Sequence, residues 1–119
     1  QIVPFHNCFK ESASTHEIDP NLLIAVAIVE SSLDPTAISK ANALGLMQIK
    51  WPQTAEHLGI LNRTLLFDPC TNIEAGARYL AEVREPYLLL TQQPRSNMML
   101  AAYRIGPNAL KGFDKMINM

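Results

Sequence analysis

The stretch LLIAVAIVE, residues 22–30, most constrains what this chain can fold into. Its apolar residues recur at helical spacing on more than one face, so the pattern predicts a short helix that is buried on nearly all sides. Asp19 can cap the start of this helix, whereas Pro35 disfavours helix at the residue before it. The helix is therefore expected to end near Leu33, with Glu30 as the single carboxylate in its last turn.

Glu30 is the first candidate for a chemical role. Apolar neighbours withhold water from a carboxyl group, and the negative end of a helix dipole also disfavours the ionised form. An acid that stays protonated near neutral pH can donate a proton to a leaving group. The alternative is a solvated glutamate at a helix end, and this stretch alone leaves both interpretations open.

Composition places the chain among small folded domains. It has 119 residues, of which 48% are hydrophobic and 18% are charged, as is typical of a folded globule and not of a disordered segment. We therefore expect residues 1–119 to form one domain. The net charge of −1, without a run of Lys or Arg, gives no indication of nucleic-acid or anionic-membrane binding. The apolar runs are far too short for a membrane span, and no signal peptide is visible, as in a mature or trimmed product.

The cysteines and histidines show no metal-binding pattern. Cys8 and Cys70 lie too far apart in sequence for a metal motif, and no ligand spacing joins them to the histidines. We therefore expect no metal and no cofactor, and interpret His6, His16 and His57 as surface or packing residues. The cysteine count leaves two interpretations open: two buried thiols, or a disulfide if the chain is exported.

Helix signals recur along the chain, whereas very little strand is indicated and no hairpin signal is present. We expect five or six short helices, with Gly76 inside one of them marking close packing against a neighbour. Besides the Glu30 helix, the expected helices span residues 4–15, 52–58 before Gly59, 69–84 between Asp68 and Pro86, 97–105, and 108–118. The expected connections are loops at 34–43, 62–68 and 86–94, and a brief strand or extended turn at 45–50.

Four short motifs follow one another in order. They are Glu30-Ser31, then Gly45-Leu46-Met47-Gln48-Ile49, then Asn72-Ile73 with Gly76-Ala77 and Tyr79-Leu80, and then Ala101-Ala102-Tyr103-Arg104-Ile105-Gly106-Pro107. Each motif alone is weak, but GLMQI shortly after ES, with AAY-x-x-GP downstream, is specific in combination. From about Pro20 to Leu110, the chain resembles the soluble lytic transglycosylase family, which has a goose-lysozyme-like catalytic domain.

This resemblance implies a fold, a substrate and a reaction. The expected fold is mainly α, within the α+β lysozyme-like superfamily: one small helical domain with a groove for a glycan chain and little strand. The implied substrate is bacterial peptidoglycan, cleaved at the β-1,4 bond between N-acetylmuramic acid and N-acetylglucosamine. The implied products end in 1,6-anhydro-N-acetylmuramic acid.

The resemblance also implies roles for individual residues. Glu30 matches the catalytic acid of the family. The residues at its substrate-binding positions are Ser39, Gln48, Lys50, Ala102 and Tyr103. Hydroxyl and amide groups suit the directional hydrogen bonds that sugars offer. The hydroxyl of Tyr103 is expected close to Glu30, where it could orient the carboxyl group and stabilise positive charge on the sugar.

Two positions depart from the family pattern. Arg104 follows the motif tyrosine, where asparagine is usual, and its longer cationic side chain could reach a peptide-stem carboxylate or face solvent. Asn42 stands where glycine is common, and asparagine tolerates the left-handed turn that such a position implies.

A narrower likeness concerns cellular context. Asn7-Cys8-Phe9 and the run Asp68-Pro69-Cys70-Thr71-Asn72-Ile73 resemble the small transglycosylases that accompany secretion systems, pili and conjugation machines. This likeness implies a periplasmic or secreted monomer with a Cys8–Cys70 disulfide. Its implied partners are the peptidoglycan glycan strand and components of such an apparatus.

Two other functions share these motifs: a muramidase, which is a lysozyme-type hydrolase, and a non-catalytic peptidoglycan-binding assembly protein. Glycosidases that use water or a protein nucleophile normally place a second carboxylate near the acid. Asp34 is instead expected to hydrogen-bond backbone in the turn that contains Pro35, and Glu56 is expected to face water. A single acid favours the transglycosylase, in which the substrate supplies its own nucleophile.

Overall fold

The computed structural model describes residues 3–90, with side chains described as far as Val83. Its elements are α1 (His6–Thr15), α2 (Pro20–Ser31), β1 (Ala43–Leu44), β2 (Ile49–Lys50), α3 (Gln53–His57), the 3₁₀ helix η1 (Arg63–Phe67) and α4 (Pro69–Leu90). The described part is mainly helical with two short strands, which is the lysozyme-like α+β class expected from the sequence. The expected helices at 97–105 and 108–118, with Ala102, Tyr103 and Arg104, lie outside the described residues.

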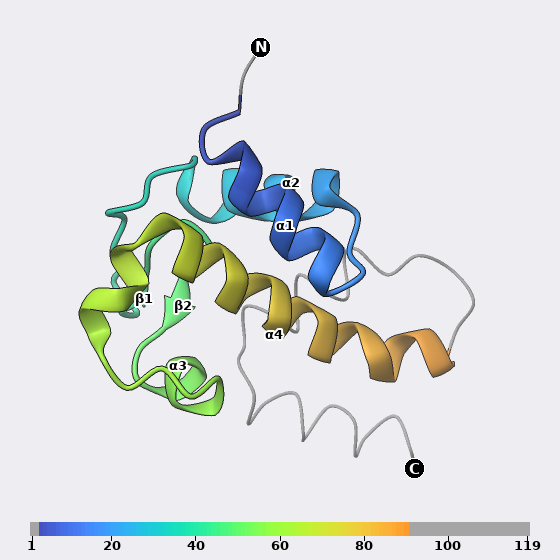
Figure 1. The fold of residues 1–119 in the computed structure, drawn as a ribbon. Helices are drawn as coiled ribbons and strands as arrows, with labels where there is room; N and C mark the ends of the chain where they lie inside the picture. Colours follow the sequence, from blue (N-terminus) through green and yellow to red (C-terminus); the bar gives the residue numbers. More distant parts are fainter. Residues whose placement is uncertain (1–2, 91–119) are drawn as a thin grey trace.

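The longest of these helices, α4, is the element on which the others assemble (Figure 1). The helix α1, the 3₁₀ helix η1 and strand β2 pack against it, whereas α2 packs on α1 and α3 packs on β2. The large, fully buried side chains come from nearly every element: Phe9, Leu23, Leu44, Leu46, Met47, Ile49, Leu66, Ile73, Tyr79, Leu80 and Val83. The hairpin and the end of α2 are thus tied to one core.

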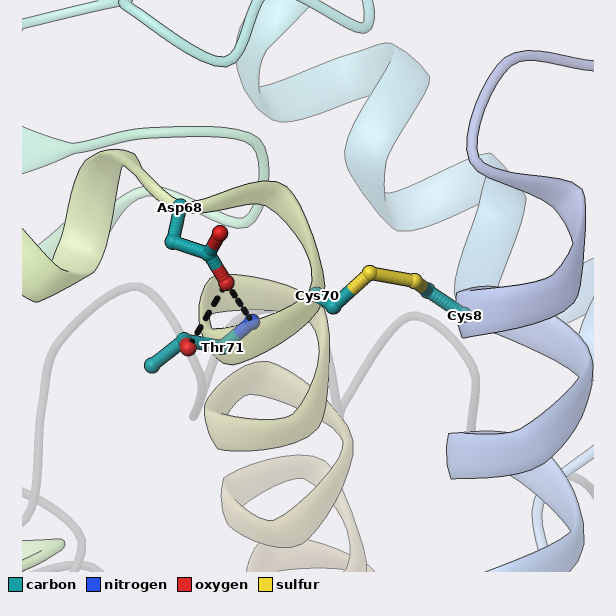
Figure 2. The surroundings of a disulfide bond; sticks show 4 residues. All are labelled: Cys8, Asp68, Cys70 and Thr71. Carbon is teal, nitrogen blue, oxygen red and sulfur yellow. Dashed lines mark hydrogen bonds between the residues drawn. A yellow bond between two sulfur atoms is a disulfide. The ribbon is translucent and has the colours of Figure 1, made fainter.

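A disulfide joins α1 to the first turn of α4. Cys8 and Cys70 form this bond, and their Cα atoms lie 5.2 Å apart (Figure 2). This is the pairing implied by the likeness to the small transglycosylases that accompany secretion systems, pili and conjugation machines. Beside it, the Asp68 carboxylate accepts hydrogen bonds from the Thr71 backbone N–H at 2.9 Å and the Thr71 hydroxyl at 2.8 Å. These bonds, the backbone one first, hold the pKa of Asp68 below its usual value. The predicted cap of α4 is confirmed.

The expectation that α2 is buried on nearly all sides is wrong. Leu23, Val26 and Ala27 are buried, but Ile28 and Val29 are 49% and 56% exposed. A helix needs only one apolar stripe to pack on a core, so apolar composition on all faces overstates burial. The predicted end of this helix was close: Ser32 and Leu33 both adopt left-handed backbone conformations just after Ser31.

Two predicted connections differ from the structure. The expected helix end before Pro86 is wrong, because α4 continues to Leu90. A helix can continue through a proline, because the fixed φ of proline is itself helical, although the missing N–H donor and the clash of the ring with the preceding turn disfavour this. The stretch at 62–68 contains η1, and the Asn62 side chain caps it by accepting from the Thr64 backbone N–H at 3.1 Å.

The sequence showed no hairpin signal, yet β1 and β2 form an antiparallel hairpin in which Ala43 pairs with Lys50 and Leu44 with Ile49. Strands of two residues are too short for an alternating pattern to be recognised. The four-residue connection also lacks the Asn-Gly or Asp-Gly pair that marks a tight hairpin. The segment at 45–50 is therefore part turn and part strand, which combines the two expected alternatives.

Candidate functional site

Glu30 lies in the last turn of α2, and its side chain is half-buried. Every other Asp or Glu between residues 3 and 83 is exposed. Because a helix end holds the Glu30 backbone, the position of this carboxyl group does not depend on a loop. In this part of the chain, Glu30 is the carboxylate whose access to water is most restricted.

Ser31, the residue after Glu30, connects α2 to the turn of residues 45–48. Its hydroxyl oxygen lies 2.8 Å from the backbone oxygen of Leu46 and 3.1 Å from that of Ala27. One hydroxyl hydrogen serves these two acceptors, and the shorter contact is the one that leads to the turn. The same oxygen accepts from the Asp34 backbone N–H at 3.3 Å. The residue next to the candidate acid therefore fastens the hairpin turn to its helix.

Gln48 closes this turn with a left-handed backbone, φ 54°. Its amide nitrogen donates to the backbone oxygens of Gly45 at 2.9 Å and Ala37 at 3.2 Å. Reversing the amide would set oxygen against two oxygens, so these bonds settle which way it points. Among residues 3–83, whose side chains are described, the amide oxygen of Gln48 has no hydrogen-bond donor, so within this part of the chain it can accept a hydrogen bond from a ligand.

Ser39 and Lys50 lie on either side of β1. The Ser39 hydroxyl accepts the Ala43 backbone N–H at 3.0 Å, which leaves its own hydrogen available to donate. Lys50 pairs with Ala43 across the hairpin and is half-buried. Asn42, between them, has φ 63°, so the left-handed turn expected at this position is confirmed.

Asp34 and Glu56 are the two candidates for the second catalytic carboxylate that a hydrolase would need. The Asp34 carboxylate accepts from the backbone N–H of Thr36 at 2.9 Å and from its hydroxyl at 2.8 Å. These bonds, the backbone one first, lower the pKa of Asp34. Glu56 is exposed on α3. Both predictions are confirmed: Asp34 organises a turn, and Glu56 faces water.

Of the predicted site residues, Gln48, Lys50 and Ser39 belong to one hydrogen-bonded unit of loop, turn and hairpin. Ser31 fastens this unit to the helix of Glu30. Ala102 and Tyr103 lie outside the described residues, so their place beside this unit stays a prediction.

Asn72 on α4 belongs to the Asn72-Ile73 motif, but the motif alone predicted no role for it. Its fully buried amide bonds the backbone at Met47, Leu44 and Leu66. The available signal was its spacing. Asn72, Gly76, Leu80 and Val83 recur at i, i+4, i+8 and i+11, which places a polar side chain on an apolar stripe. A buried polar group at such a position requires partners.

Among residues 3–90, no helix is long and apolar enough to cross a membrane. Among the side chains described between residues 3 and 83, no group of three or more His, Cys, Asp or Glu is arranged to hold a metal ion.

Comparison with known proteins now identifies the family. Residues 7–115 match the model of the transglycosylase SLT domain. The chain is 37% identical over 116 residues to membrane-bound lytic murein transglycosylase C of Actinobacillus pleuropneumoniae serotype 5b (strain L20), an alignment that covers 88% of this chain and 32% of that protein. It is 33% identical over 110 residues to the protein of the same name from Salmonella arizonae, covering 85% and 31%.

The chain therefore spans about a third of the length of the curated relatives it matches. The family model nevertheless covers nearly the whole chain. The chain belongs to the transglycosylase SLT domain family.

Proposed function

We propose that this chain is a peptidoglycan lytic transglycosylase. It would cleave the β-1,4 bond between N-acetylmuramic acid and N-acetylglucosamine and leave 1,6-anhydro-N-acetylmuramic acid ends. The observation that carries the proposal is the half-buried Glu30, the one carboxylate between residues 3 and 83 that is not exposed. Relatives named lytic murein transglycosylase support the same reaction class.

One acid is sufficient for this reaction. Protonated Glu30 donates its proton to the glycosidic oxygen, and the bond from that oxygen to the anomeric carbon of the muramyl residue breaks. The muramyl N-acetyl group shields the cationic centre. The C6 hydroxyl then attacks the anomeric carbon while the Glu30 carboxylate accepts the hydroxyl proton, which closes the 1,6-anhydro ring. Glu30 ends protonated, as it began, and no water is consumed.

The other carboxylates favour this route over hydrolysis. Asp34 lies four residues from Glu30, but one of its oxygens is held by the backbone N–H and hydroxyl of Thr36. Glu56 is exposed on α3. A hydrolase of the common types would need such a group within several ångströms of the acid, on the order of 5–10 Å, and positioned toward the sugar.

Substrate binding is assigned to groups of the loop, turn and hairpin that Ser31 joins to the helix of Glu30. The amide oxygen of Gln48 would accept from a sugar hydroxyl or acetamido N–H, and the hydroxyl of Ser39 would donate to a sugar oxygen. Lys50 would line the same groove, where its ammonium group suits the carboxylates of peptide stems. Ala102 and Tyr103 complete the proposed groove on the basis of the motif alone.

The products of cell-wall digestion test the proposal. Purified sacculi incubated with the full chain should lose turbidity and release muropeptides that end in 1,6-anhydromuramic acid, each lighter by one water than a lysozyme product. Mass spectrometry with and without borohydride reduction separates the two end groups. If the products carry reducible muramic acid ends, the chain is a muramidase. Asp34 is then the first residue to replace by mutation. If the sacculi stay intact, the remaining candidate function is that of a non-catalytic peptidoglycan-binding protein.

We also infer that the chain acts as a monomeric domain in the bacterial envelope, periplasmic or secreted. The Cys8–Cys70 disulfide supports an oxidising compartment. The likeness at Asn7–Phe9 and at Asp68–Ile73 supports work beside a secretion, pilus or conjugation apparatus, where local openings in the wall are needed. Deleting the chain should then reduce export or transfer by that apparatus without slowing growth. Unchanged export or transfer would contradict a role beside such an apparatus. Light scattering of the purified chain tests whether it is a monomer.

A further inference from the structure

Asn72 makes three hydrogen bonds from a fully buried position. Its amide oxygen accepts the Met47 backbone N–H at 2.7 Å. Its amide nitrogen donates to the backbone oxygens of Leu44 and Leu66, each at 2.8 Å. Both amide hydrogens and one oxygen lone pair are therefore used, and every partner is backbone.

The three backbone groups require an amide and no other side chain of this size. They present one donor and two acceptors, which is the reverse of what asparagine presents. Aspartate would set an anionic oxygen against two carbonyl oxygens. Alanine would leave three backbone groups without their partner in a site closed to water, and buried unpaired backbone groups are strongly disfavoured.

These contacts hold the 45–48 turn at the residue before it and at a residue within it. Leu44 precedes the turn and Met47 lies within it, one residue before Gln48. Gly45 has φ +77°, and a Cβ atom there would lie 2.3 Å from the Asn72 amide nitrogen, so glycine is what allows the approach. The Gln48 side chain in turn donates to the Gly45 oxygen at 2.9 Å. The orientation of Gln48 thus depends on a turn that Asn72 fastens.

The same turn is also fastened to Ser31, the residue after the candidate acid. The Ser31 hydroxyl, next to Glu30, lies 2.8 Å from the Leu46 oxygen. The turn is therefore held between α4, through Asn72, and α2, through Ser31. Met47 also packs tightly on α4, since a Cβ atom at Gly76 would lie 2.6 Å from its side chain. The expected close packing at Gly76 is confirmed.

We propose that Asn72 is a positioning residue for the reaction: its three hydrogen bonds set Gln48 at a defined place relative to Glu30. The inference rests on the function proposed above, because it presumes that Gln48 contacts the glycan. Asn72 itself touches no substrate in this scheme. Errors of about 1 Å in the placement of reacting groups reduce rates on the order of 100-fold, so the loss of this anchor has a measurable consequence.

The test uses the full chain with its disulfide intact and the variants Asn72→Asp and Asn72→Ala. The control is Val83→Ala, a core truncation about three helical turns further along α4. Anhydro-product release is measured at a temperature where each protein is fully folded. We expect kcat/KM to fall on the order of 100-fold in both Asn72 variants and by less than about threefold in the control. Asn72 variants that stay within about threefold of the control would overturn the proposal.

A second readout does not depend on activity. In ¹⁵N-resolved NMR spectra, the Met47 backbone amide and the Gln48 side-chain amide should shift in the Asn72 variants and stay in place in Val83→Ala. Unmoved signals overturn the positioning role. If the wild-type chain releases no anhydro product, the proposed function fails, while these spectra still decide whether Asn72 orients Gln48.

If both Asn72 variants fail to fold, the proposal can be tested on the wild-type protein. Amide hydrogen exchange of Met47 should then be as slow as that of buried amides in α4, because Asn72 holds it. Exchange of Met47 at the rate of an open loop would show that Asn72 does not fix the turn.

Discussion

Glu30 occupies a place where a helix ends and the chain reverses, with a serine immediately after it that bonds to the neighbouring turn. This arrangement holds the Glu30 backbone at a helix end and ties the next residue, Ser31, to the 45–48 turn. Its half-buried state distinguishes it from the eight other carboxylates between residues 3 and 83, all exposed: Glu11, Glu17, Asp19, Asp34, Glu56, Asp68, Glu74 and Glu82. Chemistry that uses one acid twice is compatible with such a site.

Replacing Glu30 tests this assignment at the residue scale. Glu30→Gln keeps the shape and polarity of the side chain but cannot supply a proton, so release of anhydro-muropeptides should fall about 100- to 10,000-fold. The melting temperature should change little. The matched control is Glu56→Gln, on the exposed side of α3, which should retain wild-type activity. A Glu30→Gln variant with more than a small fraction of the wild-type rate would assign the acid elsewhere.

At the scale of elements, α4 supports the site at a distance. Asp68 caps this helix just before its first turn, which carries Cys70 and Asn72, and Gly76 lies one turn further along. Asn72 bonds the 45–48 turn, and Met47 of that turn packs on Gly76. Fraying at the start of α4 would therefore loosen the anchor of Gln48. The cap of this helix is a stability feature that also bears on the site.

The Asp68 cap predicts a pH dependence of stability. Hydrogen bonds from Thr71 lower the folded-state pKa of Asp68, so the unfolded state binds the proton more readily. The contribution of Asp68 is therefore present above about pH 4, near the unfolded pKa, and is lost as pH falls through the lower folded-state value. Asp68→Ala should reduce the free energy of unfolding at pH 7 by about 1 kcal/mol.

Urea unfolding at pH 7 and at pH 3 measures this effect. The difference between wild type and Asp68→Ala should narrow as the pH falls. Asp68→Asn is the control, because asparagine caps helices about as well but does not titrate in this range. An Asp68→Ala deficit that is equally large at both pH values would show that the ionised carboxylate is not what caps α4.

For the whole molecule, the disulfide closes a loop that contains nearly all of the described site. Cys8 and Cys70 are separated by 62 residues, and α2, the hairpin, α3 and η1 lie between them. Two His–Glu pairs add contacts to α4: His16 with Glu74 at 3.1 Å and His57 with Glu82 at 2.6 Å. These pairs are partly exposed, and such pairs contribute little compared with a covalent closure.

Reduction of the disulfide should therefore weaken the fold without touching the chemistry. The chain-entropy relation for a loop of this size gives about 4 kcal/mol, which corresponds to a fall in melting temperature on the order of 10–20 °C. A double Cys8→Ser, Cys70→Ser variant should show the same fall. It should also stay active below its own transition.

Calorimetry of oxidised and reduced protein makes this measurement. One cooperative transition in the oxidised protein would also support the proposal that residues 1–119 form a single domain. An unchanged melting temperature on reduction, or loss of activity while the reduced protein is still folded, would contradict the purely structural role of the bond.

Local signals in the sequence were sufficient for several features. The start of α2 at Pro20, its end near Leu33, the cap at Asp68 and the turn at Asp34 were predicted correctly. Each depends on residues within a few positions of one another, where capping groups, prolines and short side chains act directly on the backbone. The motif resemblance added the family and the disulfide pairing.

Only the tertiary structure decided how these pieces meet. Ser31 reaches Leu46 across 15 residues, and Asn72 reaches Leu44 across 28. Periodicity says that a side chain faces the core but not which backbone group it meets there, because that depends on how separate elements pack. For the same reason, the exposed side of α2 at Ile28 and Val29 could not be foreseen: hydrophobic sequence favours burial, but the neighbours available determine which face is covered.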